Sequence, residues 1–174
     1  MKLSTSQKLI VKSYLETSAV GLNESDSATL LNTLVSPAYF VWKSVVTRAD
    51  VQAAVGFDWT RVDNLSVGKS RIWDWMFNAI DSMQPWRGNY RVGVNATWIG
   101  TQADLDVRAA VISACQRPVT NFEKFFVTQV TDGPEQSGNR GLSTNADKLG
   151  VDSDGAFIEG TANEQFVSDI RGGL

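Results

Sequence analysis

The chain has 174 residues, 43% of them hydrophobic and 20% charged, with a formal net charge of −3 at pH 7, which is typical of a globular protein with its own core. It has no histidine, which removes the commonest general base and transition-metal ligand, and its single cysteine excludes an intramolecular disulfide framework. We find no basic patch, no signal-like N-terminus and no run of eighteen apolar residues. We therefore expect no cofactor, no metal, no membrane span and no sequence-specific binding of nucleic acid.

Two helices are predicted in the first 36 residues. Ser4 and Gln7 form a capping-box pattern at the start of a helix over residues 4–17, in which each side chain satisfies the other's free backbone N–H. Ser25 or Asp26 can cap a second, shorter helix, which Ser36-Pro37 would end.

The next segment changes character. Residues 39–46, Y-F-V-W-K-S-V-V, are aromatic and β-branched, which predicts a strand or extended segment. Thr47 and Asp50 repeat the capping-box pattern and predict a short helix that ends at Gly56.

Residues 56–83 predict a polar loop followed by a long helix, capped by Asn64 or Ser66. Large apolar residues recur at helical spacing after the cap, and only a narrow polar stripe lies opposite them. We therefore expect this helix to be buried on most sides and to be the scaffold of the domain. The apolar residues are Ile72, Trp73, Met76, Phe77, Ala79, Ile80 and Met83, and the stripe is Asp74, Asn78 and Asp81.

Three further segments follow a turn at residues 84–88. Residues 89–99 fit either a helix or a strand, with the helix favoured because Tyr90, Val94 and Trp98 recur at a spacing of four. Residues 102–115 predict a second core helix, started by Thr101 with Asp104. Thr120 and Glu123 then predict one last short helix before residue 127.

The composition shifts near residue 128. Residues 1–127 carry a net charge of +2, whereas residues 128–174 carry −5 and many turn-forming residues, which are concentrated in residues 131–154. We predict a mainly α fold: a compact helical bundle with a short β element over residues 1–127, and an extended Gly/Asp-rich arm over residues 128–174. A terminal helical turn capped by Thr161 with Glu164 is expected at the end of the arm.

The arm ends in a short apolar set, Phe157, Ile158, Phe166 and Ile170. A polar tether cannot bury enough surface to offset its own ordering entropy, so these side chains are expected to dock on a partner or a neighbouring copy. Removal of the arm should then leave the melting temperature of the domain almost unchanged.

Two catalytic motifs were tested. Gly68-Lys69-Ser70 matches the end of a phosphate-binding loop, but Asp63 stands where the leading glycine must be. Asp58 and Asp63 are a candidate carboxylate pair for a glycosidase, with Trp86 and Trp98 as a sugar-stacking platform. The favoured alternative is that Arg61 bridges both acids across a surface turn.

Two runs of sequence carry a resemblance to a known group: G-F-D-W-T-R-V-D-N-L-S-V-G-K-S-R-I-W-D-W-M-F and N-A-T-W-I-G-T-Q-A-D-L-D-V-R-A-A-V-I-S-A-C-Q-R. They resemble small virion-associated proteins encoded in tailed-bacteriophage genomes, over roughly residues 36–127. The resemblance implies a head–tail connector (neck or adaptor) protein that forms a ring below the portal. It implies no catalytic residues.

The resulting expectation is a structural, non-enzymatic protein, made in the bacterial host cytoplasm and located at the head–tail junction of the virion. Its expected partners are other copies of itself and the portal, neck and tail proteins, with DNA passing through the ring. The alternatives are a tail-terminator or other tail subunit and a carboxylate-dependent phage hydrolase. The predicted interface residues are Trp59, Arg61, Asp63, Trp86, Phe157, Ile158, Phe166 and Ile170.

Overall fold

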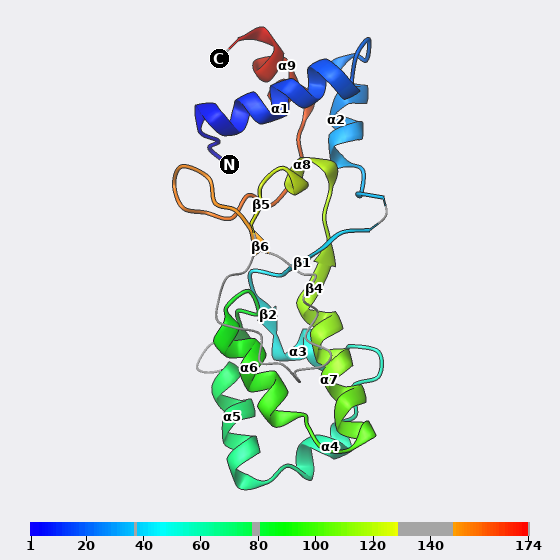
Figure 1. Ribbon diagram of the computed structural model, residues 1–174, viewed down its shortest axis with the longest axis vertical. Helices are drawn as coiled ribbons and strands as arrows, with labels where there is room; N and C mark the ends of the chain where they lie inside the picture. The colour runs from blue at the N-terminus through cyan, green and yellow to red at the C-terminus, as the bar shows by residue number, and fades with distance from the viewer. Residues whose placement is uncertain (37, 78–80, 129–147, 174) are drawn as a thin grey trace. The chain divides into compact units, whose positions relative to one another are not determined.

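The computed structural model describes residues 1–36, 38–77, 81–128 and 148–173. Helices predominate among these residues, and the strands are short and paired in twos, so the predicted mainly α class is confirmed. The chain divides into two units, and the division is not the predicted one at residue 127 (Figure 1). Unit 1 comprises residues 1–40, 118–128 and 149–174, and unit 2 comprises residues 41–117 and 129–148.

Unit 1 contains helices from both ends of the chain: α1 (Thr5–Ser18), α2 (Glu24–Asn32), α8 (Asn121–Lys124) and α9 (Glu164–Gly172). Helix α9 packs on α1 and α2, and α8 packs on α2. The strands β5 (Val127–Thr128) and β6 (Lys148–Leu149) pair with each other.

Local capping explains where the helices of unit 1 begin. The predicted capping boxes at Ser4 and Thr120 are both present. The predicted caps of the other two helices are wrong by two or three residues. In each helix the cap is an asparagine, whose side chain reaches the free N–H groups. Asn23 Oδ1 accepts from Asp26 N at 2.8 Å, and Asn163 caps α9 in the same way.

The core of unit 1 draws on all three of its chain segments. Val11 and Leu31 come from the N-terminal segment, Phe122 from the middle one, and Ile158 and Ile170 from the C-terminal one, and all five are buried. The described C-terminal residues therefore belong to a folded unit and do not form a separate arm. The apolar side chains that were expected to dock on a partner pack instead against other residues of the same chain.

Polar contacts tie the C-terminal segment to the N-terminal one. The amide of Asn32 exchanges two hydrogen bonds with the backbone of Ala162, at 2.7 and 2.8 Å. Asp152 accepts from the backbone N–H of Lys2 at 2.9 Å. Most of the predicted polar tether, residues 131–147, lies outside the described residues.

The described residues of unit 2 are almost all consecutive in sequence. Its helices are α3 (Arg48–Gln52), α4 (Trp59–Asp63), α5 (Val67–Phe77), α6 (Gly88–Thr97) and α7 (Gln102–Cys115), and β2 (Val46–Thr47) pairs antiparallel with β3 (Ser82–Met83). The predicted helix 102–115 and the capping boxes at Thr47 and Thr101 are confirmed. Residues 89–99 are mainly helical. The predicted strand 39–46 is instead two short strands, β1 (Phe40–Trp42), which pairs with β4 (Gln116–Pro118), and β2.

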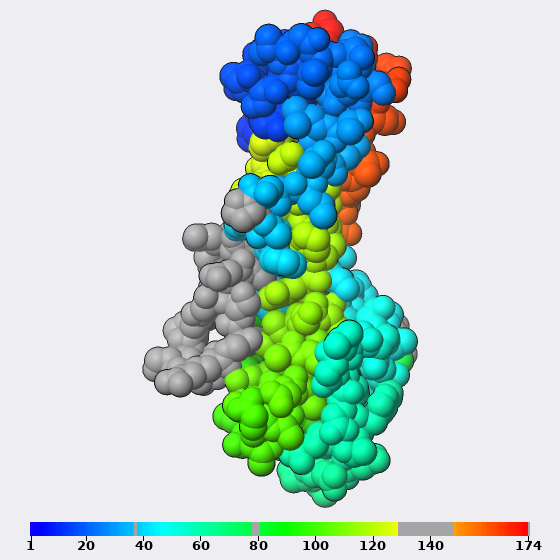
Figure 2. All heavy atoms as spheres, turned by 90° about the vertical axis from the view of Figure 1, so that its right-hand side faces the viewer, coloured from blue at the N-terminus to red at the C-terminus, as the bar shows by residue number. Residues whose placement is uncertain are grey.

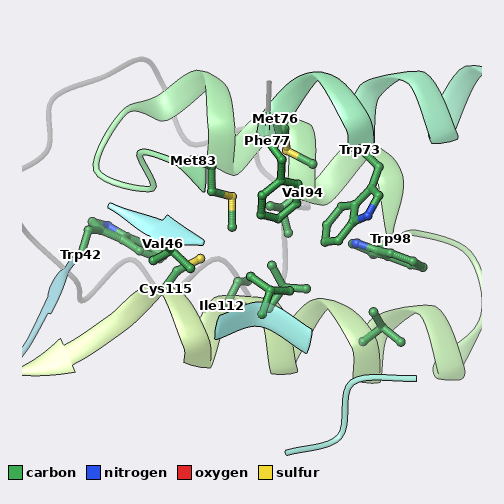
Figure 3. Packing of buried hydrophobic residues seen from close by; sticks show 13 residues of the cluster. Trp42, Val46, Trp73, Met76, Phe77, Met83, Val94, Trp98, Ile112 and Cys115 are labelled. Carbon is green, nitrogen blue, oxygen red and sulfur yellow. The ribbon is translucent and has the colours of Figure 1, made fainter. Parts of the chain in front are cut away.

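The core of unit 2 lies between α5 and α7 (Figure 3). Its largest members are aromatic: the rings of Trp73 and Trp98 meet edge to face at 5.2 Å, and Phe77 packs against Trp73 at 5.0 Å. Met83, Ile112 and other apolar side chains fill the rest of the space. Edge-to-face aromatic packing of this kind adds about 0.5–1.5 kcal/mol per pair beyond the burial of area.

Candidate protein interface

Helix α5 has one buried and one exposed side, contrary to the expectation that it is buried on most sides. Trp73, Met76 and Phe77 are buried in the core of unit 2, whereas Trp75 is 83% exposed and Val67 is also exposed. Some of the large apolar residues of α5 therefore fill the core, and the others are exposed to solvent.

Helices α5 and α6 pack closely because α6 presents a glycine at their contact. A methyl group at Gly93 would come within 2.6 Å of Met76 Sδ and 3.6 Å of Ile72 Cγ2. At one end of the pair, Lys69 Nζ donates to the backbone carbonyl of Ile99 at 3.0 Å. These two contacts show that the helices run antiparallel, with Lys69 near Ile99 at one end and Met76 and Ile72 near Gly93 further along.

This arrangement gathers an apolar strip on the outer side of the helix pair, which we call the α5–α6 strip. The α5 side contributes Gly68, Ile72 and Trp75. The α6 side contributes Val92, Ala96 and Ile99, the last of which lies two residues past the helix end. All six residues are exposed, Val92 and Ile99 to about half of their surface. An apolar surface of this kind, next to a highly exposed tryptophan, is typical of a protein–protein contact site.

Basic side chains border the α5–α6 strip. Arg71 is exposed and follows the strip on α5, and Lys69 lies at its end. The acidic residue of the same helix, Asp74, points to Arg48 at 3.5 Å. The border of the strip is therefore net positive.

A second exposed surface of unit 2 is formed by α4, the segment before it and α7, and we call it the α4–α7 face. Val55 is 98% exposed and Trp59 is 52% exposed, in the segment that runs from α3 into α4. Figure 2 shows this segment (cyan to teal) beside α7 (lime). The exposed carboxylates of the face are Asp58, Asp63 and Asp106, and Ala109 is its exposed small residue on α7.

A partly buried ion pair holds α4 on α7. Arg61 donates from Nε to Asp104 Oδ1 at 3.2 Å, and its Nη2 also donates to that oxygen and to Thr101 Oγ1. Asp104 closes the capping box of α7 as well. The hydrogen bond from Arg61 is the main cause that holds the pKa of the Asp104 carboxyl below its ordinary value.

The predicted interface residues of unit 2 have separate roles. Trp59 and Asp63 are exposed on α4, as an interface requires. Arg61 does not bridge Asp58 and Asp63, because its guanidinium is bound to Asp104. Trp86 is half-buried, and the cations of Arg87 and Lys148 lie over its ring at 4.8 and 5.3 Å.

Of the predicted interface residues of unit 1, Ile158 and Ile170 belong to its core and Phe166 packs against it. Ile158 and Ile170 are fully buried. Phe166 is half-buried and meets Phe122 edge to face at 5.4 Å, and Phe157 is half-buried in a β-bridge with Val151. Because their surfaces are used within the chain, Ile158 and Ile170 cannot serve a partner while unit 1 is folded.

Two of the residues considered for a hydrolase, Asp58 and Trp98, have structural roles. Asp58 Oδ1 caps α4 by accepting from the backbone and hydroxyl of Thr60, at 2.9 and 2.8 Å. Trp98, the proposed sugar platform, is fully buried and cannot stack on a ligand. Burial also raises the pKa of the Cys115 thiol to about 12, so it is not a thiolate nucleophile at neutral pH.

Comparison with known proteins identifies no relative: no family model, curated protein or solved structure matches the chain. Among the described residues, no helix is long and apolar enough to cross a membrane, and no three metal-ligating side chains gather as a site.

The α5–α6 strip was missed in the sequence, although a signal for it exists. Gly68, Ile72 and Trp75 follow a spacing of four and three, and Val92, Ala96 and Ile99 repeat it. Helical spacing shows that such residues share a face, but it does not show whether another element covers that face.

Proposed function

We propose that the chain is a structural, non-enzymatic subunit of a bacteriophage head–tail connector, which assembles with further copies of itself into a ring between portal and tail. The observation that carries the proposal is the α5–α6 strip, in which Trp75 stands 83% exposed beside exposed Ile72 and Val92. A monomer that works alone has no use for such a surface, whereas a subunit covers it in the assembly. The two sequence runs that resemble virion proteins contain five of the six residues of the strip.

The roles of the charged residues agree with this proposal. Asp58 and Asp104 hold helix starts, and Arg61 fixes α4 to α7, so these groups maintain the geometry of unit 2. The exposed residues beside them, Trp59 and Asp63, then remain available for contacts with neighbouring subunits.

The direct test locates the protein in particles. Antibodies raised against the purified chain are applied to phage particles produced by the strain that carries its gene, and bound gold is mapped by electron microscopy. We expect label at the head–tail junction, and we expect that loss of the gene yields filled heads without tails. Label along the tail would favour a tail subunit, and particles without label would refute a virion role.

A peptidoglycan zymogram tests the enzymatic alternative separately. We expect no clearing by the wild-type chain. Clearing that is lost in Asp58→Asn would show that the chain is a hydrolase.

A further inference from the structure

We infer that unit 2 associates head to tail: the α5–α6 strip of one copy binds the α4–α7 face of the next copy. This inference deepens the proposed function, because it names the two surfaces that would meet around a ring. It also stands as a statement about the isolated protein, whose association can be measured without any phage particle.

Each surface has an apolar centre that can lose water on contact. The α5–α6 strip offers Trp75, Ile72 and Val92, and the α4–α7 face offers Trp59 and Val55. Tryptophan is among the residues that contribute most to binding when an interface covers them. Both rings are exposed before any partner binds, so no part of the fold has to open.

The charges on the two surfaces are opposite. Arg71 and Lys69 border the strip, whereas the α4–α7 face carries Asp58, Asp63 and Asp106. Among the described residues, neither Arg71 nor Asp63 forms an ion pair within the chain. A strip-to-strip contact would bring like charges together, while a strip-to-face contact pairs opposite ones, which favours the second arrangement.

The placement of the surfaces makes the contact repeatable. The core of unit 2 lies between α5 and α7 (Figure 3), and the strip and the face have no residue in common. When one copy uses its strip, its face stays free for another copy. Such a heterologous contact produces rings or open chains, whereas a self-complementary contact stops at a dimer.

The test uses one variant for each surface. Trp75→Asp disables the strip and Trp59→Lys disables the face, and the mass distribution of each full-length chain is measured by analytical ultracentrifugation over a range of concentrations. We expect the wild type to form oligomers larger than dimers and each variant alone to be monomeric. An equimolar mixture of the two should form 1:1 heterodimers and nothing larger, because only one intact strip and one intact face meet.

A control variant, two tests of the charges and a check of folding complete the experiment. Val20→Asp changes an exposed apolar residue of unit 1 and should associate like the wild type. Arg71→Glu should weaken association at least tenfold, and added salt should weaken that of the wild type. Thermal melts of all variants check that they are folded.

Several outcomes would overturn the inference. A wild type that stays monomeric throughout, or a folded Trp75→Asp that associates normally, would show that the strip is not a self-association surface. If Trp59→Lys associates normally while Trp75→Asp does not, the strip binds itself and the head-to-tail mode is wrong. Oligomers without label at the head–tail junction of particles would instead refute the connector proposal and leave the contact standing.

Discussion

Units 1 and 2 each bury a helical core, but they build that core from differently arranged segments of the chain. Unit 2 takes nearly all of its described residues from one continuous stretch, residues 41–117, whereas unit 1 joins the two ends of the chain to a short segment in the middle. In unit 1, Leu31 and Ile170 share a core although they are far apart in sequence. Closing such long loops costs entropy before any contact stabilises the unit.

This difference implies that the two units depend differently on the chain ends. Unit 2 contains α5, α6 and α7 in sequence order and can form its core from neighbours along the chain. Unit 1 cannot form without its C-terminal segment, which supplies Ile158, Val167 and Ile170. Local contacts also form faster than distant ones, so unit 2 should be the first to fold.

Truncation should produce the largest effect. Removal of residues 149–174 takes α9 and four fully buried side chains, Leu149, Ile158, Val167 and Ile170, from unit 1. Burial of each side chain is worth about 1.5–3 kcal/mol, so we expect unit 1 to unfold while unit 2 stays folded. All six tryptophans lie in residues 41–117, so tryptophan emission reports unit 2 alone. Far-ultraviolet circular dichroism should show loss of helix while the emission spectrum stays native.

A paired substitution in α9 is the control for that truncation. Ile170→Ala should destabilise unit 1 by about 2–5 kcal/mol, while Ser168→Ala, at an exposed position, should change its stability by less than about 0.5 kcal/mol. If truncation leaves the helix content and melting of α1 and α2 unchanged, the C-terminal residues are an arm after all, as the sequence suggested.

Trp73 and Trp75 offer a smaller and more local test, within unit 2. Trp73 is buried among aromatic rings, whereas Trp75, two residues later, is 83% exposed. Trp73→Ala should therefore lower the free energy of unfolding by about 3–5 kcal/mol. Trp75→Ala should change it by less than about 0.5 kcal/mol in the monomer. Denaturant unfolding at low protein concentration measures both, and similar costs would show that the orientation of α5 is misassigned.

The sequence predicted well those features that depend on neighbouring residues. The capping boxes at Ser4, Thr47, Thr101 and Thr120 are short-range patterns, and each marks a helix start in the structure. Helix 102–115 was predicted with its bounds, because its cap and its apolar run agree. Two caps were assigned to the wrong residue, since several residues near those helix starts can serve as caps.

Features that depend on distant contacts were not predictable. Composition separates residues 128–174 from the rest, but it does not reveal that Ile158 and Ile170 meet Leu31. Among the predicted interface residues, Trp59 and Asp63 are exposed, and the more exposed Trp75 was not among them, because a periodic apolar pattern does not say which of its sides has a neighbour. The predicted partners of Arg61, Asp58 and Asp63, were also wrong. Its actual partner, Asp104, is 43 residues away in sequence.

The smallest expected effect concerns the ion pair that fixes α4 within unit 2. Because Arg61 holds the pKa of Asp104 below the ordinary value of about 3.9, this carboxylate stabilises the folded state fully above that pH. The stabilisation is lost as the pH falls through the lower folded pKa. Asp104→Asn should therefore cost about 1.5–3 kcal/mol at pH 7, the usual range for a hydrogen bond to a charged group, and progressively less as the pH falls below about 3.9.

Tryptophan-detected unfolding of unit 2 at pH 7, 4 and 2 measures this dependence, with Asp63→Asn as the control, since Asp63 is exposed and has no ion pair among the described residues. The control should change stability by less than about 0.5 kcal/mol at every pH. A cost for Asp104→Asn that is the same at all three pH values would mean that the side chain acts through its shape and capping alone. The anchoring of α4, and with it the position of Trp59 on the α4–α7 face, would then not depend on the charge of Asp104.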